Sequence, residues 1–169
     1  GFGEHVAVGD GTAEPDGADN CTTSVNLDGT GDNVISYSTV TDLYHSVDSA
    51  YRASNSCAFV MSDATVAVCK KILDDNSRPL WNTSMNSNMA VGQEGFLLGK
   101  KVIVDNWVTD NHIIFGDWSR YRVRLVGNVR TQVLNELFCI SAGVGLVGFG
   151  RMDSDLLDAN ALKKLVSAE

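Results

Sequence analysis

The sequence predicts an α+β fold. Two helix-like segments come early in the chain, several strand-like segments follow, and the two kinds do not alternate as they would around a parallel sheet. No internal repeat is visible. The length of 169 residues and the apolar content of 44% suit one compact domain, or two small intertwined ones.

Helical periodicity marks three segments. Residues 39–52 gather apolar and aromatic side chains on one helical face. The pattern repeats up to about residue 74 in a second helix, which either Ser62 or Asp63 could cap. Residues 158–166 are expected to form a terminal helix with its apolar side chains inward: Ala161, Leu162 and Leu165. Between the helices and the strands, residues 82–95 are polar and rich in Asn and Met, which indicates a long loop.

Apolar runs and alternation predict the strands. Cys57–Met61 is a short apolar run, which is typical of a buried strand. Residues 121–134 alternate between polar and apolar, with a slip at residues 127–128 that indicates either a hairpin turn or a bulge. Residues 137–149 are almost entirely apolar and Gly-rich, and they predict a strand buried on both faces. Two more short strands are expected: residues 102–105 and 112–115.

Composition excludes several classes of function. The net charge of −8 and the pI of 4.7 argue against a protein that seeks phosphate backbones, and so against a sequence-specific nucleic-acid binder. No apolar run is long enough for a membrane span, and no signal peptide is visible. The cysteines are scattered, without the short spacing of a zinc site, and are expected to be free thiols: Cys21, Cys57, Cys69 and Cys139.

Three patterns that could carry chemistry have simpler interpretations. Residues 143–148 match G-x-G-x-x-G, but too little chain follows for a dinucleotide-binding unit, so a strand with closely packed glycines is expected. Residues 9–12 lack the Lys of a phosphate loop and the ligand pattern of a calcium loop, which leaves a structural turn. His45 has no catalytic partner nearby in the sequence, and we interpret it as a partly buried structural histidine. No metal site or cofactor is expected.

A cluster of aromatic and basic residues allows two interpretations. Trp118 and Tyr121, with Arg120, Arg122 and Arg124, could form a nucleic-acid platform. Alternation instead places the three arginines on one strand face, where they suit ion pairs between subunits of an acidic protein. We favour the subunit contact and keep contact with DNA as the alternative.

Five sequence blocks, taken in their order along the chain, carry a resemblance to a known family. We call two of them the first and the second block: VGDGTAEPDG at residues 8–17 and IIFGDWSRYR at residues 113–122, roughly a hundred residues apart. They resemble the major capsid protein family of tailed phages, which has the Hong Kong 97-like fold. Three other blocks fit between and after these two. They are residues 44–51 followed by CAFVMS at residues 57–62, which look like the family's helix and buried strand, FLLGKKV at residues 96–102 with Lys101 where the family often has Pro, and Arg151-Met152-Asp153 with Ala161.

The resemblance implies a division of the chain into parts. In the family, the first block is a turn that closes the long spine helix and leads into the axial domain; its residues here are Gly9, Asp10, Gly11, Pro15 and Gly17. Residues 1–19 would be the end of the spine helix and this turn, residues 20–123 the axial domain, residues 124–150 strands of the peripheral domain, and residues 151–169 a return to the axial domain. The N-terminal arm, the extended loop and most of the spine helix would be missing.

The resemblance also implies a structural function without an enzymatic site or a cofactor. Pentamers and hexamers of the chain would build an icosahedral phage or prophage shell around double-stranded DNA, a virion capsid assembled in the cytoplasm of the bacterial host. Partners would be other copies, scaffolding or protease, portal and decoration proteins, and packaged DNA by non-specific proximity, but no membrane. Trp81 and Met85 are expected to line subunit contacts near the capsomer axis.

Two other functions stay open. The same fold builds encapsulin compartments, which enclose cargo enzymes, and a soluble α+β enzyme or ligand-binding domain is a third possibility. Some members of the capsid family form an isopeptide bond between a Lys and an Asn, helped by a Glu. Asn135 lies at the matching Asn position, but Ala142 stands where the Glu should be, so this cross-link is not expected here.

Overall fold

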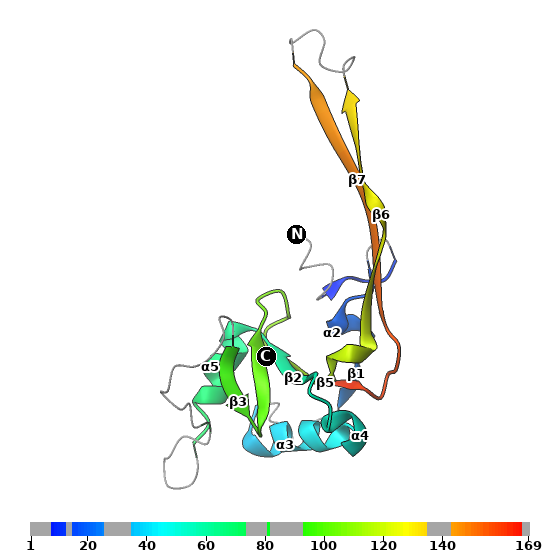
Figure 1. Cartoon of the computed structure of the whole chain (residues 1–169). Coiled ribbons are helices and arrows are strands. Elements are labelled where there is room, and N and C mark those ends of the chain that lie inside the picture. The colour runs from blue at the N-terminus through cyan, green and yellow to red at the C-terminus, as the bar shows by residue number, and fades with distance from the viewer. Residues whose placement is uncertain are drawn as a thin grey trace.

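The computed structural model is organised by a six-stranded mixed sheet and a separate two-stranded ribbon that extends far beyond the sheet (Figure 1). It describes residues 8–12, 15–25, 35–73, 81, 93–134 and 143–166. The strands of the sheet, in spatial order, are β1 (Thr23–Val25), β8 (Leu162–Val166), β5 (His112–Asp117), β2 (Cys57–Met61), β4 (Lys100–Val104) and β3 (Gln93–Leu97). The pairs β1–β8 and β2–β4 are parallel, and the other neighbours are antiparallel.

The helices are short and flank the sheet. They are α2 (Ala18–Cys21), α3 (Tyr37–Ser46), α4 (Ser49–Arg52), α5 (Asp63–Lys70) and the 3₁₀-helix η1 (Trp118–Arg120). Residues 39–52, expected as one helix, form α3 and α4 instead, because the Asp48 carboxylate accepts a hydrogen bond from the Ala50 backbone N–H and starts a second helix. Ser62 caps α5, as its sequence indicated, but α5 ends at Lys70 rather than near residue 74.

The central strands β2 and β5 are buried on both faces, which accounts for the unbroken apolar run of β2. Side chains of a strand point alternately to opposite faces. Phe59 and Phe115 stack on one face with ring centroids 4.2 Å apart, within a core that also includes residues of α3 and α5. Val60 and Ile114 point to the other face, where Ala18 of α2 completes a second, smaller core. The sheet therefore joins two apolar layers.

The predicted terminal helix is wrong, because Leu162–Val166 is a strand. β8 lies between β1 and β5 and hydrogen-bonds to both. The three side chains expected inward are all fully buried, but Leu162 belongs to one core and Leu165 to the other. A strand that is covered on both faces can have apolar residues at the same spacing as the apolar face of a helix. Pairing with neighbouring strands decides whether the segment forms a helix or a strand.

The ribbon consists of β6 (Tyr121–Leu134) and β7 (Gly145–Leu156), paired antiparallel. Its register shifts between Val126 and Arg130, so the slip predicted at residues 127–128 is a bulge and not a hairpin turn. The prediction that residues 137–149 are buried is wrong for the described part: Leu146 is 75% exposed and Phe149 is 59% exposed. Residues 135–142, which include Asn135 and Ala142, and residues 82–92 of the expected loop lie outside the described residues.

Candidate functional site

The first sequence block forms a tight reversal of the chain. Asp10 and Asp16 form an antiparallel bridge, and the backbone N–H of Gly17 donates to the carbonyl of Gly9 at 2.9 Å. Gly11 has a positive φ of 72°, which favours glycine. A Cβ on Gly17 would lie 2.4 Å from the backbone N of Gly9, so only glycine fits there. Pro15 is buried beside them.

This reversal contacts the base of the ribbon. The Tyr121 hydroxyl lies 2.9 Å from the backbone carbonyl oxygen of Asp16 and 2.9 Å from the Ser154 hydroxyl. Ser154 Oγ donates to the same carbonyl at 3.0 Å, and Ser154 is buried. These hydrogen bonds join β6, β7 and the turn at one point. The two blocks that carried the resemblance, far apart in sequence, thus meet in the structure.

The Phe-Gly-Asp of the second block turns the chain from the sheet into the ribbon. A Cβ on Gly116 would lie 2.0 Å from the carbonyl oxygen of Ala161, and its φ of 148° also favours glycine. The Asp117 carboxylate accepts from the Ser119 backbone N–H at 3.0 Å and so caps η1. Trp118 Nε1 donates to the Ala58 carbonyl at 3.1 Å. The motif residues therefore fix the direction in which β6 leaves the sheet.

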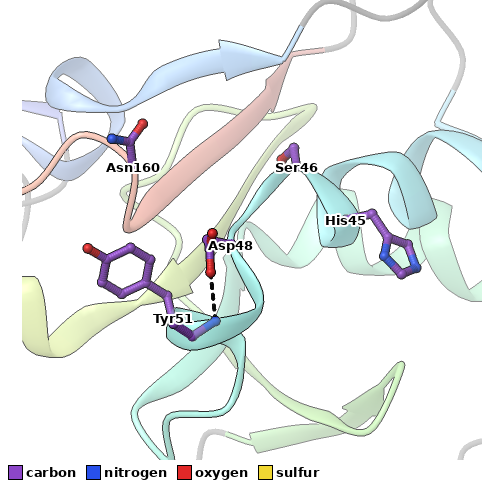
Figure 2. Close-up of a pocket in the computed structure, with 6 residues that line it drawn as sticks. His45, Ser46, Asp48, Tyr51 and Asn160 are labelled. Atoms are coloured by element: carbon purple, nitrogen blue, oxygen red, sulfur yellow. Dashed lines mark hydrogen bonds between the residues drawn. The ribbon is translucent and has the colours of Figure 1, made fainter.

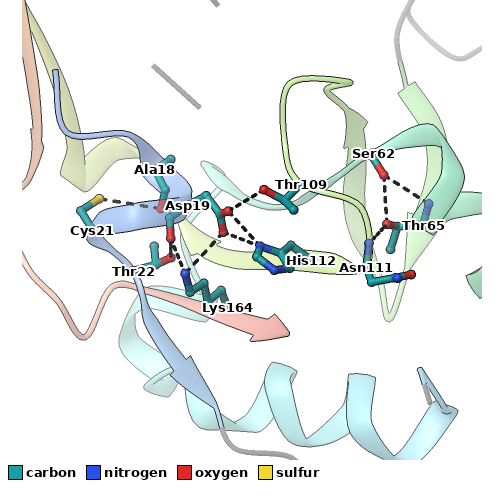
Figure 3. Close-up of polar contacts among 10 residues, drawn as sticks. All are labelled: Ala18, Asp19, Cys21, Thr22, Ser62, Thr65, Thr109, Asn111, His112 and Lys164. Atoms are coloured by element: carbon teal, nitrogen blue, oxygen red, sulfur yellow. Dashed lines mark hydrogen bonds and ion pairs between the residues drawn. The ribbon is translucent and has the colours of Figure 1, made fainter. Parts of the chain in front are cut away.

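A buried carboxylate, that of Asp19, holds α2 against the sheet (Figure 3). Its side chain is 9% exposed and lies 2.8 Å from His112 Nδ1, while Lys164 Nζ lies 3.6 Å from the other carboxylate oxygen. The Thr109 hydroxyl donates to Asp19 at 3.2 Å, and Lys164 Nζ also donates to the Asp19 carbonyl at 2.6 Å. No spacing in the sequence indicates this cluster, because its members come from three separate segments of the chain.

The hollow lined by residues of α3, α4 and the segment before β8 does not form a catalytic arrangement (Figure 2). Its volume is about 680 Å³. The Asp48 carboxylate accepts a hydrogen bond from the Ala50 backbone N–H at 2.8 Å. The labelled side chains spread around the hollow and do not converge on one point. His45, expected to be partly buried, is exposed; its ring contacts the Arg52 guanidinium at 3.2 Å and the Tyr44 ring edge-on.

The described cysteines are free thiols that burial makes poor nucleophiles. Burial raises the pKa of Cys21 and of Cys69 to about 11, so neither thiol ionises near neutral pH. Cys57 is also free and buried in the core. Among the described residues no group of three or more His, Cys, Asp or Glu side chains could hold a metal ion. In the same part of the chain, no helix is long and apolar enough to cross a membrane.

A hydrogen bond between Tyr51 and Asp158 gives a testable pH dependence. The Tyr51 hydroxyl donates to the Asp158 carboxylate, which lowers the pKa of Asp158 below 3.8 and raises the pKa of Tyr51 above 10.0. A lowered carboxyl pKa stabilises the fold above pH 3.8, and a raised tyrosine pKa stabilises it below pH 10.0. The stabilisation is therefore fully present between these two values. It is lost as the pH falls through the folded-state pKa of Asp158 or rises through that of Tyr51.

We expect Tyr51→Phe to lower the urea midpoint at pH 7 and to leave it close to wild type once the pH has fallen through the folded-state pKa of Asp158. Urea denaturation across the acid range measures this. Tyr37→Phe, which removes another hydroxyl from a side chain that is 46% exposed, is the control and should show no such pH dependence. If Tyr51→Phe lowered the urea midpoint by the same amount at all pH values, the lost stability could not come from the hydrogen bond to the Asp158 carboxylate.

The expected subunit-contact residues lie in different surroundings. Trp81 is 5% exposed and belongs to the main core, so its ring leaves little surface for a neighbouring subunit. Met85 lies outside the described residues. Arg120 is the last residue of η1 and not part of the strand, and its guanidinium lies 5.9 Å from the centroid of the Tyr51 ring. Arg122 and Arg124 are exposed on one face of β6, directly across from Asp155 and Asp153 of β7.

In this fold, the residues of the two sequence blocks and Asp19 make contacts that hold helices, strands and turns together. These contacts are typical of a structural protein. The chain belongs to the phage capsid family, whose model matches residues 2–167. This family is structural, not enzymatic. Its α+β architecture is the Hong Kong 97-like capsid fold. A comparison with curated proteins found no match.

Solved structures share this fold. The capsid of an empty GTA particle matches with a TM-score of 0.75 and 24% identity, over 98% of this chain and 60% of that chain. The Gordonia phage Cozz matches with a TM-score of 0.60 and 20% identity, over 88% of this chain and 50% of that one. A virus-like particle from Pyrococcus furiosus matches with a TM-score of 0.52 and 13% identity, over 96% of this chain and 61% of that one. The chain thus spans between half and two thirds of these proteins.

Proposed function

We propose that the chain is the structural subunit of an icosahedral phage or prophage capsid, which assembles into pentamers and hexamers around double-stranded DNA. Membership of the phage capsid family supports the proposal, as does the likeness to the GTA capsid over nearly the whole chain. The shell would be that of a virion, assembled in the bacterial cytoplasm. Portal, scaffolding or protease, and decoration proteins would be further partners.

The observation that carries the proposal is the exposed ribbon. A two-stranded ribbon is at best marginally stable when water surrounds both faces. Apolar side chains nevertheless line this one: Leu125 is 65% exposed, Val129 is 68% exposed and Val133 is 53% exposed. Surfaces of this kind mark contacts with other protein. In a shell, neighbouring subunits would cover the ribbon and bury these apolar side chains, which explains why the ribbon can carry them.

We further propose that the six-stranded sheet and its helices belong to the axial domain and the ribbon to the peripheral domain. The ribbon's length and the hydrogen bonds of the turn at its base support this division. The ribbon begins at Tyr121, close to the boundary expected at residue 124. After β7, the chain returns to the sheet as β8, which agrees with a return to the axial domain.

Negative-stain electron microscopy of the product of the intact gene, expressed alone or with its neighbouring genes, tests the proposal. We expect closed, uniform icosahedral particles. Nuclease-protected DNA in these particles would support a phage shell, whereas protein cargo would identify an encapsulin-type compartment. Only small dispersed particles, with and without the neighbouring genes, would contradict the shell function and favour a ligand screen for a soluble domain.

A further inference from the structure

A hollow of about 580 Å³ lies on one face of the ribbon, at the bulge in β6. We call it the bulge hollow, and its lining residues come from both strands: Val126, Gly127, Asn128, Arg130, Phe149 and Arg151. Val126 lies directly across from Arg151 and, beyond the bulge, Arg130 lies across from Phe149. Residues directly opposite in an antiparallel pair share a face. The two arginines therefore stand on different strands, one on each side of the bulge.

These two arginines differ from the other two on the ribbon. Arg122 and Arg124 each lie across from an aspartate of β7. Arg130 and Arg151 lie across from Phe149 and Val126 and are exposed. Within the part of the chain that the structure describes, none of the four arginine side chains forms an ion pair or a hydrogen bond, so the two pairs differ in the residues that lie across from them. The bulge hollow thus presents two guanidinium groups whose charge no cross-strand carboxylate offsets.

The ribbon also differs in charge from the rest of the chain. Its two strands carry four arginines and two aspartates, a net charge of +2, so the remainder of the chain carries −10. Two copies can then attract each other when the ribbon of one faces the acidic surface of the other. Because an interface of this kind joins different patches, it repeats around a ring, as pentamers and hexamers require.

We propose that the bulge hollow binds a carboxylate-bearing segment of a second copy of this chain. Its floor favours protein over nucleic acid: Phe149 is 59% exposed and Val126 is 42% exposed between the arginines. A phosphate backbone makes no use of an apolar floor, whereas a protein segment buries apolar side chains there and places its carboxylate against the guanidinium groups. Arginine and aromatic residues are also the types that dominate binding energy at protein interfaces.

This inference rests on the proposed shell function, and its test compares two double variants of the product of the intact gene. Arg130→Gln with Arg151→Gln removes the charge of the bulge hollow. Lys71→Gln with Lys101→Gln is the control, because it removes the same amount of charge from positions outside the ribbon. Light scattering as a function of protein concentration measures the threshold for assembly, and urea midpoints of the unassembled proteins show whether each variant folds.

We expect the bulge-hollow variant to raise the assembly threshold about tenfold or more, at an unchanged urea midpoint, and the control to raise it much less. Arg130→Lys with Arg151→Lys should recover part of the loss. Equal thresholds for the two glutamine variants would overturn the inference. Normal assembly with less retained DNA would also overturn it, and would assign the hollow to phosphate instead. A wild-type protein that forms no shells would reject the shell function itself, before any variant is compared.

Discussion

Gly116→Ala should prevent stable folding of the subunit. The added Cβ would lie 2.0 Å from the Ala161 carbonyl oxygen and 2.9 Å from the Leu162 Cα, both of which are backbone atoms that no side-chain rotation can move. Gly116 pairs with Leu162 of β8 on one side and with Ala58 of β2 on the other, so relief would require the two central strand pairings to separate. The φ of 148° adds strain for any residue with a side chain.

We expect a loss of about 4 kcal/mol or more in the free energy of unfolding. Urea denaturation measures this where the variant is soluble, and the soluble yield reports it where the variant is not. Gly99→Ala is the matched control, because Gly99 has a φ of 76° but a Cβ added there would meet nothing within 4 Å. It should cost only the backbone strain, about 1–2 kcal/mol. Similar losses for the two variants would show that the contact with Ala161 is not the cause.

Asp19→Ala should have the second-largest effect. It removes the carboxylate that lies between His112 and Lys164. The Lys164 ammonium, whose side chain is 16% exposed, keeps the backbone carbonyl at position 19 as an acceptor but has no carboxylate to offset its charge. Removing one member of a buried ion pair is costly because the remaining charge stays desolvated. We expect a loss of about 3–5 kcal/mol in the free energy of unfolding, measured by urea denaturation. Asp42→Ala, at an exposed position of α3, should change it by less than about 1 kcal/mol.

A double-mutant cycle with Lys164 measures how much of the stability lost in Asp19→Ala comes from the ion pair with Lys164. Lys164→Met removes the charge that Asp19→Ala leaves unpaired, so the double variant should lose less than the sum of the two single variants. A coupling energy of about 1–3 kcal/mol is expected. Strictly additive losses would show that Asp19 acts through its contacts with His112 and Thr109, and not through Lys164.

Three neighbouring strands of the sheet, β5, β2 and β4, could be predicted from the sequence, since their signals are local. β1 was not predicted as a strand, and β3 begins within residues 82–95, which were expected to form a loop. The run from Cys57 to Met61 is apolar at every position, and the structure makes it a strand with those bounds, buried on both faces. The Ser62 cap likewise acts within one helical turn. The irregularity at residues 127–128 could be anticipated, since a slip in a period of two is visible without a partner strand. The choice of a bulge over a hairpin turn depended on the pairing with β7.

The predictions from the sequence were wrong where one local pattern is compatible with two different structures. Ala161, Leu162 and Leu165 suit a helix facing one core, and they equally suit a strand between two cores. The glycines and apolar residues of β7 indicate a strand, but the burial of a strand depends on a second layer. No described segment provides that layer for the ribbon, and Leu146 and Phe149 are exposed.

By itself the sequence determined the class of fold, the family resemblance and the acidic character of the chain, because these depend on composition, periodicity and ordered motifs. Tertiary structure alone decided which distant groups meet. It placed Asp19 between His112 and Lys164, brought the Asp16 carbonyl to Tyr121, and left Arg130 and Arg151 without carboxylates across from them. Each of these contacts depends on strand register and on the packing of remote segments, which no local pattern encodes.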